Sequence, residues 1–250
     1  MKVIICKLRL NSLYSIRVPY TWQSALSYPI LPPSAIIGIF ANALQRYKND
    51  RFPLEYLKMV EENTEWVGCK LDSPAVVKSY TTSAITKWET KIGDKSTNAL
   101  GRQFIFGRNL KIAGIFSNDN FILEISPALK KVGITCGDSE SLCSIEEIIT
   151  EEVQKHEFNT EEEIEIEFPI PFNFEEIEIL EGTGNLYLMH QKCDKGNLKH
   201  FPLKTYFYPL RIEDGILYPE KVKIKLKRKF VGYKFEEKKK KKIVIESFEK

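Results

Sequence analysis

The sequence predicts an α+β fold, and three stretches carry that prediction. Residues 2–10 (KVIICKLRL) alternate as a strand does, with the even-numbered residues on the side expected to be buried. Residues 34–47 (SAIIGIFANALQRY) repeat apolar side chains at helical spacing. From Gly184 onwards, short apolar runs alternate with turn signals such as IEDG at 212–215, which indicates a series of short strands.

The predicted first helix follows a proline-rich loop. The prolines from Pro29 to Pro33 exclude regular structure there, because proline lacks an N–H and has a fixed φ. Ser34 stands where an N-cap belongs, and one use of Gly38 is to let the helix backbone approach a sheet closely. The apolar face comprises Ile36, Ile37, Phe40, Leu44 and Tyr47. The simplest interpretation is an ordinary core helix after a loop.

Several further elements are predicted from local patterns. A second helix opens at Pro53 and ends near Trp66, and a strand is expected over 75–80. Residues 121–125 are interpreted as a short buried strand. The C-terminal strands are expected over 186–189, 204–210 and 222–230.

A third helix and an edge strand are predicted in the acidic part of the chain. Ser144, with Glu147 three residues later, forms a capping-box pattern at the start of a helix. The acidic segment 161–167 (EEEIEIE) alternates like an edge strand, whose outward charges prevent further pairing. The lysine run at 238–242 is interpreted as a solvated tail.

Charge is unevenly distributed along the 250 residues, although the net charge is only +3. Residues 146–181 contain fourteen acidic residues and one basic residue, whereas 221–242 contain twelve basic residues and two acidic ones. Such segregation predicts separate charged faces that can serve different partners. Residues 70–115 contain eight basic and three acidic residues, and we interpret this stretch as a long basic β-hairpin or loop that projects from the body.

The cysteines and the apolar runs indicate the compartment. Five cysteines, at 6, 69, 136, 143 and 193, form no CxxC pair, which favours a reducing compartment over a disulfide framework or a structural zinc site. The N-terminus has too short an apolar run for a signal peptide, and no stretch approaches the roughly 18 apolar residues of a membrane helix. A cytoplasmic protein is therefore expected.

Catalytic motifs are scarce in this sequence. The three histidines, His156, His190 and His200, lie in no metal-ligand pattern, and neither a phosphate-binding loop nor a nucleophile elbow is present. His190 and His200 bracket a loop with three lysines, where acid–base chemistry on RNA is conceivable. Binding is therefore the stronger expectation.

Basic residues interleaved with aromatic residues are typical of binding to single-stranded RNA, because cations meet phosphates while aromatic rings stack on unpaired bases. Residues 17–28 and 78–108 have this composition. The first segment belongs to a connection of over twenty residues that is too aromatic for a disordered loop. For either segment, the alternative is a surface loop whose aromatic side chains pack on the body. The second segment contributes the candidate contacts Lys78, Tyr80, Lys87, Trp88, Lys91, Arg102 and Arg108.

Several stretches of the N-terminal half together resemble a known family. The strand KVIICKLRL leads to the loop SIRVPYTWQSALSYPILPPS and then to the helix AIIGIFANAL. Later, GDSESLCSIEEI occupies 137–148, and the basic insertion occupies about 75–115. The strand, loop and helix are similar to the N-terminal signature of the Cas-five family, in the RAMP superfamily of CRISPR-associated proteins. Residues 137–148 resemble a second stretch of that family, and the basic insertion lies where the family carries a protruding thumb. The resemblance is good over residues 1–150 and loose beyond.

The resemblance implies a ferredoxin-like (RRM-type) domain over residues 1–157, with the thumb inserted at about 75–115, and a C-terminal β-rich region with a basic tail over 158–250. It implies a non-catalytic subunit of a type I Cascade complex, in its archaeal type I-A form, that grips the 5′ handle of the crRNA and nucleates assembly for antiviral defence. The implied partners are the backbone and large subunits, without cofactor, metal or membrane. The implied handle contacts are Arg17, Tyr20, Trp22, Ser27, Tyr28 and Ser34.

Two other functions stay open. One branch of the same family cuts precursor crRNA with Tyr, Lys and His side chains, so a metal-independent endoribonuclease is the main alternative. That trio has no residue-by-residue match here, and the glycine-rich loop that many RAMP proteins carry near the C-terminus is not found either. A basic adaptor that binds acidic patches of other proteins is the third hypothesis.

Overall fold

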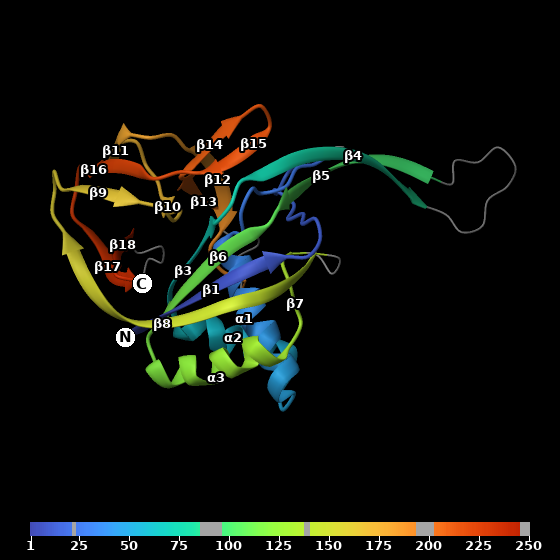
Figure 1. Cartoon of the computed structure of the whole chain (residues 1–250), viewed down its shortest axis with the longest axis horizontal. Coiled ribbons are helices and arrows are strands. Elements are labelled where there is room, and N and C mark those ends of the chain that lie inside the picture. The colour runs from blue at the N-terminus through green and yellow to red at the C-terminus, as the bar shows by residue number, and fades with distance from the viewer. Residues whose placement is uncertain (22–23, 86–96, 138–140, 194–202, 246–250) are drawn as a thin grey trace, which may run out of the picture.

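The α+β prediction is confirmed by a computed structural model that describes residues 1–21, 24–85, 97–137, 141–193 and 203–245 (Figure 1). Strands predominate in these ranges, which hold three helices. The helices are α1 (Pro33–Lys48), α2 (Pro53–Asn63) and α3 (Asp119–Lys131). The strands are β1 (Lys2–Leu10), β2 (Ser24–Ala25), β3 (Thr64–Leu71), β4 (Ala75–Ile85), β5 (Thr97–Gly107), β6 (Asn109–Phe116), β7 (Ile134–Thr135), β8 (Leu142–Phe158), β9 (Glu163–Ile166), β10 (Ile170–Pro171), β11 (Ile177–Glu181), β12 (Asn185–His190), β13 (Leu203–Tyr208), β14 (Leu210–Glu213), β15 (Ile216–Pro219), β16 (Val222–Leu226), β17 (Phe230–Glu237) and β18 (Lys240–Ile245).

The largest sheet has the strand order β18-β17-β8-β1-β6-β3 with antiparallel neighbours, and β7 pairs with β8. The three helices gather on one face of β8-β1-β6-β3 (Figure 1). Ile4, Cys6 and Leu8 of β1 belong to the core on that side. Val3 and Ile5, on the opposite side, are buried as well, because they pack in a cluster with side chains of β17 and β18. The sequence predicted only the first of these two buried faces.

The predicted hairpin is present as β4 and β5, which pair over eleven residues and project from the body (Figure 1). It belongs to a five-stranded sheet with the order β14-β15-β4-β5-β2, so the C-terminal strand β15 pairs with its base. The predicted hairpin ran on to residue 115. The structure instead assigns the last part to β6, which pairs with β1 and β3 in the largest sheet.

The strand predicted at 121–125 is wrong, because this segment lies inside α3. The Asn118 side chain accepts a hydrogen bond from the Asn120 amide at 3.0 Å and caps the helix. Apolar side chains then recur at helical spacing, and Phe121, Ile125 and Leu129 are buried. A five-residue apolar run does not distinguish a strand from one and a half turns of a buried helix.

The helix predicted from Ser144 is also wrong, because residues 142–158 form the long strand β8. β8 pairs with β1 along its first half, with Cys6 opposite Ile148 and Lys2 opposite Glu152. Pairing with a buried strand outweighs a helical pattern that local sequence favours. The capping-box pattern at Ser144 is therefore not used as a helix cap.

Two predicted helix ends differ by a few residues. α1 begins at Pro33 after an N-cap at Pro32, without a side-chain cap, so Ser34 is not the N-cap. Proline suits the first turn of a helix because its missing N–H would be unpaired there. α2 ends at Asn63 rather than near Trp66, because β3 begins at Thr64 and buries Trp66 completely.

The C-terminal region pairs with the N-terminal one. β17 pairs with β8 in the largest sheet, so strands from both sides of the proposed boundary at residue 157 are adjacent; the division into two domains stays a prediction. The lysine run is not a solvated tail, since Lys240–Ile245 form β18 and Lys242 is only 9% exposed. No helix in the described ranges is long and apolar enough to cross a membrane.

Candidate functional site

The two segments predicted to contact RNA lie side by side in the structure. β2, from the loop that precedes α1, pairs in parallel with β5, with Ser24 opposite Gly101. Tyr14 and Ile105 exchange backbone hydrogen bonds of 3.1 and 2.9 Å. The Gln103 side chain accepts a bond of 3.0 Å from the Ser27 amide. The loop is therefore fastened along the edge of the hairpin.

The buried residues of the loop hold it in place. Tyr28 is 2% exposed, donates a hydrogen bond to the Leu188 carbonyl and contacts Tyr187 edge-to-face, and burial raises the pKa of Tyr28 to about 12. Ser27 is buried, and its hydroxyl accepts from the Ile16 amide at 3.0 Å. Neither side chain is available to a ligand in this conformation, which corresponds to the alternative that loop aromatics pack on the body.

Other loop residues face solvent. Tyr20 is 82% exposed, in a left-handed backbone conformation with φ of 61°. Arg17 is exposed and donates to the Thr21 carbonyl at 2.9 Å. Ser34 is half-buried in α1, and its carbonyl accepts a bond from the Cys193 thiol at 3.0 Å. Trp22 lies outside the described residues. Of the five loop candidates that the structure describes, Arg17 and Tyr20 are the best placed to meet a ligand.

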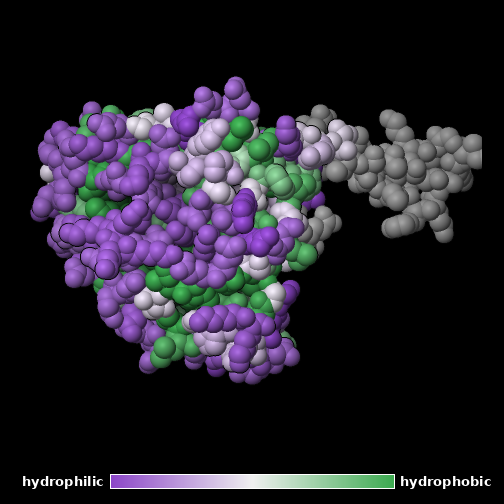
Figure 2. All heavy atoms as spheres, in the orientation of Figure 1, coloured by the Kyte–Doolittle hydropathy of each residue, from purple (hydrophilic) through white to green (hydrophobic). Residues whose placement is uncertain are grey.

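The hairpin carries an aromatic and basic platform on one face, which we define as Lys78, Tyr80, Arg102, Phe104 and Phe106. Lys78 lies opposite Phe104, and Tyr80 opposite Arg102, so the five side chains emerge on the same side. Phe106 is 61% exposed and Tyr80 50% exposed. Figure 2 shows hydrophobic surface where the hairpin leaves the body. This arrangement leaves aromatic rings uncovered beside cations.

Contacts within the platform orient its rings. The Arg102 guanidinium lies 4.7 Å from the Phe104 ring centroid, and the Tyr80 and Phe104 rings meet edge-to-face at 5.8 Å. The opposite face of the hairpin base is packed, because Ala75 and Ile105 are each 1% exposed and belong to the core. The packed face therefore directs the platform outward.

The cations of the hairpin differ in their surroundings. Within the described residues, the exposed side chains of Lys78 and Arg108 make no ion pair. Arg102 is half-buried, and its Nε lies 3.5 Å from the Ser15 hydroxyl. The predicted contacts Lys87, Trp88 and Lys91 lie outside the described residues.

Sequence reasoning missed two members of the platform. Arg102 is among the predicted contacts but Phe104 and Phe106 are not, although the alternation of these three residues places one cation and two rings on a single face. Period-two alternation was the signal that could have identified them. The face continues onto β15, where Ile216 lies opposite Val76.

The acidic and basic segments of the C-terminal region face each other, so the prediction of separate charged faces is wrong there. β9 and β11 flank β16 in one sheet, with β9 at an edge as predicted. Lys223 pairs with Glu163 at 2.5 Å, and Lys221 with Glu165 at 2.5 Å. These cations are neutralised within the chain. We refer to these cross-strand pairs as the charge ladder.

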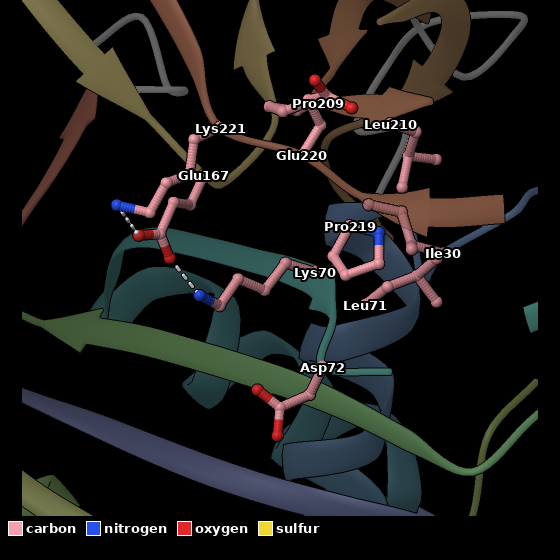
Figure 3. A pocket seen from close by; sticks show the side chains of 10 residues that line it. All are labelled: Ile30, Lys70, Leu71, Asp72, Glu167, Pro209, Leu210, Pro219, Glu220 and Lys221. Carbon is pink, nitrogen blue, oxygen red and sulfur yellow. Dashed lines mark hydrogen bonds and ion pairs between the residues drawn. The ribbon is translucent and has the colours of Figure 1, made fainter. Parts of the chain in front are cut away.

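A pocket of about 310 Å³ lies where β3, β9, β14 and β15 meet (Figure 3). Lys70 and Lys221 both point to Glu167, and Lys221 lies 3.3 Å from it. Lys242 donates to the same carboxylate at 2.6 Å. Burial opposes ionisation of Glu167, but the hydrogen bonds from Lys242 and Lys70 outweigh it and lower its pKa from 4.5 to about 2. The lysines and the carboxylate at this pocket already pair with each other.

No metal site is found among the described residues. Of the predicted pair His190 and His200, the structure describes only His190. No group of three His, Cys, Asp or Glu side chains in these ranges could hold a metal ion. His190 ends β12 and is half-buried, whereas His200 lies outside the described residues. His156 contacts Phe158 edge-to-face at 4.7 Å on β8 rather than on a helix end.

The N-terminal part of the chain is similar to a known protein family. The family model described as CRISPR-associated protein (Cas_Cas5) matches residues 5–102, which run from the middle of β1 through the proline-rich loop and α1 to the first part of the hairpin. Over these residues, about two fifths of its length, the chain is similar to the Cas5 family. No curated protein matches the sequence.

Solved structures add a likeness of fold. A crystal structure of a CRISPR protein from Archaeoglobus fulgidus is 14% identical to this chain, with a TM-score of 0.61 and 100% of each chain covered. A chain of the type III-B Cmr-beta complex bound to cognate target RNA and AMPPnP is 13% identical, with a TM-score of 0.48 over 89% of this chain and 86% of that one. A chain of a CRISPR RNA-guided surveillance complex is 13% identical, with a TM-score of 0.44 over 88% and 91%.

Proposed function

We propose that this chain is a Cas5-family protein and a non-catalytic RNA-binding subunit of a type I CRISPR effector complex, which grips the 5′ handle of the crRNA and nucleates assembly for antiviral defence. The observation that carries the proposal is the platform on the hairpin. It presents exposed rings beside Lys78, a cation without an ion pair among the described residues. Such a surface suits a single strand whose bases are unpaired.

The fold supports the same proposal. We infer a ferredoxin-like domain, and the strand order β8-β1-β6-β3 with helices after β1 and after β6 supports this inference. We infer that the hairpin between β3 and β6 is the thumb of that domain. Its projection from the body suits contact with a neighbouring backbone subunit, while the large subunit docks nearby (Figure 1). An archaeal type I-A complex in the cytoplasm is the setting that we propose.

Each ring of the platform is expected to stack on one base. Removal of such a contact costs about 1–3 kcal/mol of binding free energy per base. The loop that carries the exposed residues Arg17 and Tyr20 is fastened to β5 through β2, and we propose that these two residues extend the platform. The handle would then run along the hairpin and the loop together.

Titration with repeat RNA tests the proposal. Phe106→Ala should weaken binding by about 1–3 kcal/mol. The matched control is Phe174→Ala, which removes a ring of similar exposure, 68%, from the C-terminal region. Equal binding by both variants would contradict the platform as the RNA site. Accumulation of a discrete cleavage product from repeat RNA would support the alternative, a metal-independent endoribonuclease.

A further inference from the structure

Cys136 and Cys143 lie in contact on the β7–β8 hairpin. Ile134 pairs with Cys143 in this hairpin, and the Cys136 amide donates to the Ser141 carbonyl at 2.8 Å. Cys136 is two residues beyond Ile134, so the two cysteines are diagonal neighbours on one face. Their sulfur atoms are 3.0 Å apart. The hairpin pairing itself holds the two thiols together.

We propose that Cys136 and Cys143 are a modification site that forms an intramolecular disulfide when a low-molecular-weight disulfide is the oxidant. A disulfide has a sulfur–sulfur length of about 2.05 Å, so the sulfur atoms need to approach by only about 1 Å. Cys6 and Cys69 are also buried, but no hydrogen bond joins either of their sulfur atoms to another cysteine sulfur in the described residues. The geometry therefore selects one pair among the five cysteines.

The exchange is balanced in atoms and electrons. One thiolate attacks the oxidant and forms a mixed disulfide while one small thiol leaves. The second thiolate then attacks the mixed disulfide, the Cys136–Cys143 bond forms, and a second small thiol leaves. The two cysteine protons end on the released thiols, and the oxidant takes up two electrons. Hydrogen bonding to Cys143 and burial raise the pKa of Cys136 well above its usual value, so the exchange is slow at neutral pH.

The pair lies beneath the loop that borders the platform. Gly137 directly follows Cys136, and a Cβ atom there would lie 2.5 Å from Ile16 Cγ1 and 3.2 Å from the Ser15 carbonyl oxygen. The Ser15 hydroxyl in turn lies 3.5 Å from Arg102 Nε. A bond between the two sulfurs would therefore stabilise the hairpin end that supports the loop. The proposal concerns the thiols alone and does not depend on RNA binding.

Thiol counting on the full-length chain tests this inference. The protein is treated with oxidised glutathione, quenched, denatured and alkylated, and its free thiols are counted by mass spectrometry. The five thiols should fall to three, and cleavage after Glu140 by a glutamate-specific protease should give two peptides linked through Cys136 and Cys143. The oxidised form should also melt a few degrees higher than the reduced form.

Two variants make the result specific. Cys193→Ser, which changes a half-buried cysteine elsewhere, should still lose two thiols on oxidation, whereas Cys136→Ser should lose none to an internal bond. Five remaining thiols in the oxidised wild type would overturn the proposal. So would a linkage between any other two cysteines. Because the count is made on the wild type, poor folding of Cys136→Ser would not affect the decision.

Discussion

Lysines in two sheets of this molecule have different cross-strand neighbours. In the charge ladder, lysines of β16 lie opposite glutamates of β9, and Lys223 pairs with Glu163 at 2.5 Å. On the hairpin, Lys78 lies opposite Phe104 and makes no ion pair within the described residues. Local charge counts are therefore a poor guide to a partner. What matters is whether the cross-strand neighbour of a cation is a carboxylate or a ring.

The two aromatic segments, the loop before α1 and the hairpin, also differ in how far their rings are buried. The loop and the hairpin have similar composition, but Tyr28 of the loop is 2% exposed whereas Phe106 of the hairpin is 61% exposed. The first ring stabilises the fold and the second is free to bind. Substitutions that contrast the two regions should therefore separate stability from RNA affinity.

The largest effect is expected from Tyr28→Ala. Removal of a fully buried aromatic side chain typically costs about 3–5 kcal/mol of unfolding free energy, whereas Phe106→Ala at an exposed site should change it by about 0.5 kcal/mol or less. Urea denaturation of both variants measures the difference. If Tyr28→Ala kept its stability but lost RNA affinity, Tyr28 would be a ligand contact and the comparison would fail.

Glu167→Gln should have the next largest effect. The change leaves Lys70 and Lys242 without their shared carboxylate, and Glu167 is 12% exposed. Loss of one partner from a buried pair costs about 3–5 kcal/mol, and we expect a value near the lower end because the site borders an open pocket. Chemical denaturation at neutral pH measures it. A variant as stable as the wild type would show that the cluster contributes nothing net.

Acid should destabilise the wild type through the same carboxylate. The pKa of Glu167 is about 2 in the folded chain, whereas its ordinary value is 4.5. Its contribution to the free energy of unfolding is therefore present above about pH 4.5 and is lost as the pH falls towards 2. Melting temperatures between pH 7 and pH 2 should fall more steeply for the wild type than for Glu167→Gln. Parallel curves for the two proteins would contradict this assignment.

Salt dependence should distinguish the two kinds of lysine. If Lys78 neutralises one phosphate of a single strand, Lys78→Ala should reduce the log–log salt slope of RNA binding by about 0.7. Lys223→Ala, in the charge ladder, should leave the slope unchanged because its cation is already paired. RNA titrations at several salt concentrations measure both slopes. Equal reductions in the two variants would mean that the ladder also meets RNA.

The smallest effect is expected on stability in the charge ladder itself. Lys223 and Glu163 are both exposed to solvent, where salt and water screen their attraction. Lys223→Ala should therefore leave the melting temperature unchanged within error, in contrast to Glu167→Gln. A clear drop in melting temperature would show that the ladder acts as a cooperative network.

The sequence by itself determined the elements whose signals are local. The alternation of residues 2–10, the prolines before α1, the IEDG turn and the edge strand near 161–167 all predicted what the structure contains. These signals depend on backbone propensity and on side chains a few residues apart. The same is true of the hairpin, since its two strands are neighbours in the chain. The family resemblance over the N-terminal half rests on such continuous stretches as well.

Only the tertiary structure decided which of these residues are exposed and which are paired. Residues 144–153 became a strand because β1 lies beside them, and the Tyr28 hydroxyl is buried by a bond to Leu188, 160 residues away. The carboxylates of β9 likewise meet lysines of β16 only when the sheet forms. Pairing and burial between residues so far apart in the sequence depend on the folded chain, so no local sequence pattern predicts them. Alternation places Phe106 on one face of the hairpin, but only the fold shows that this face is left uncovered and that Phe106 is 61% exposed.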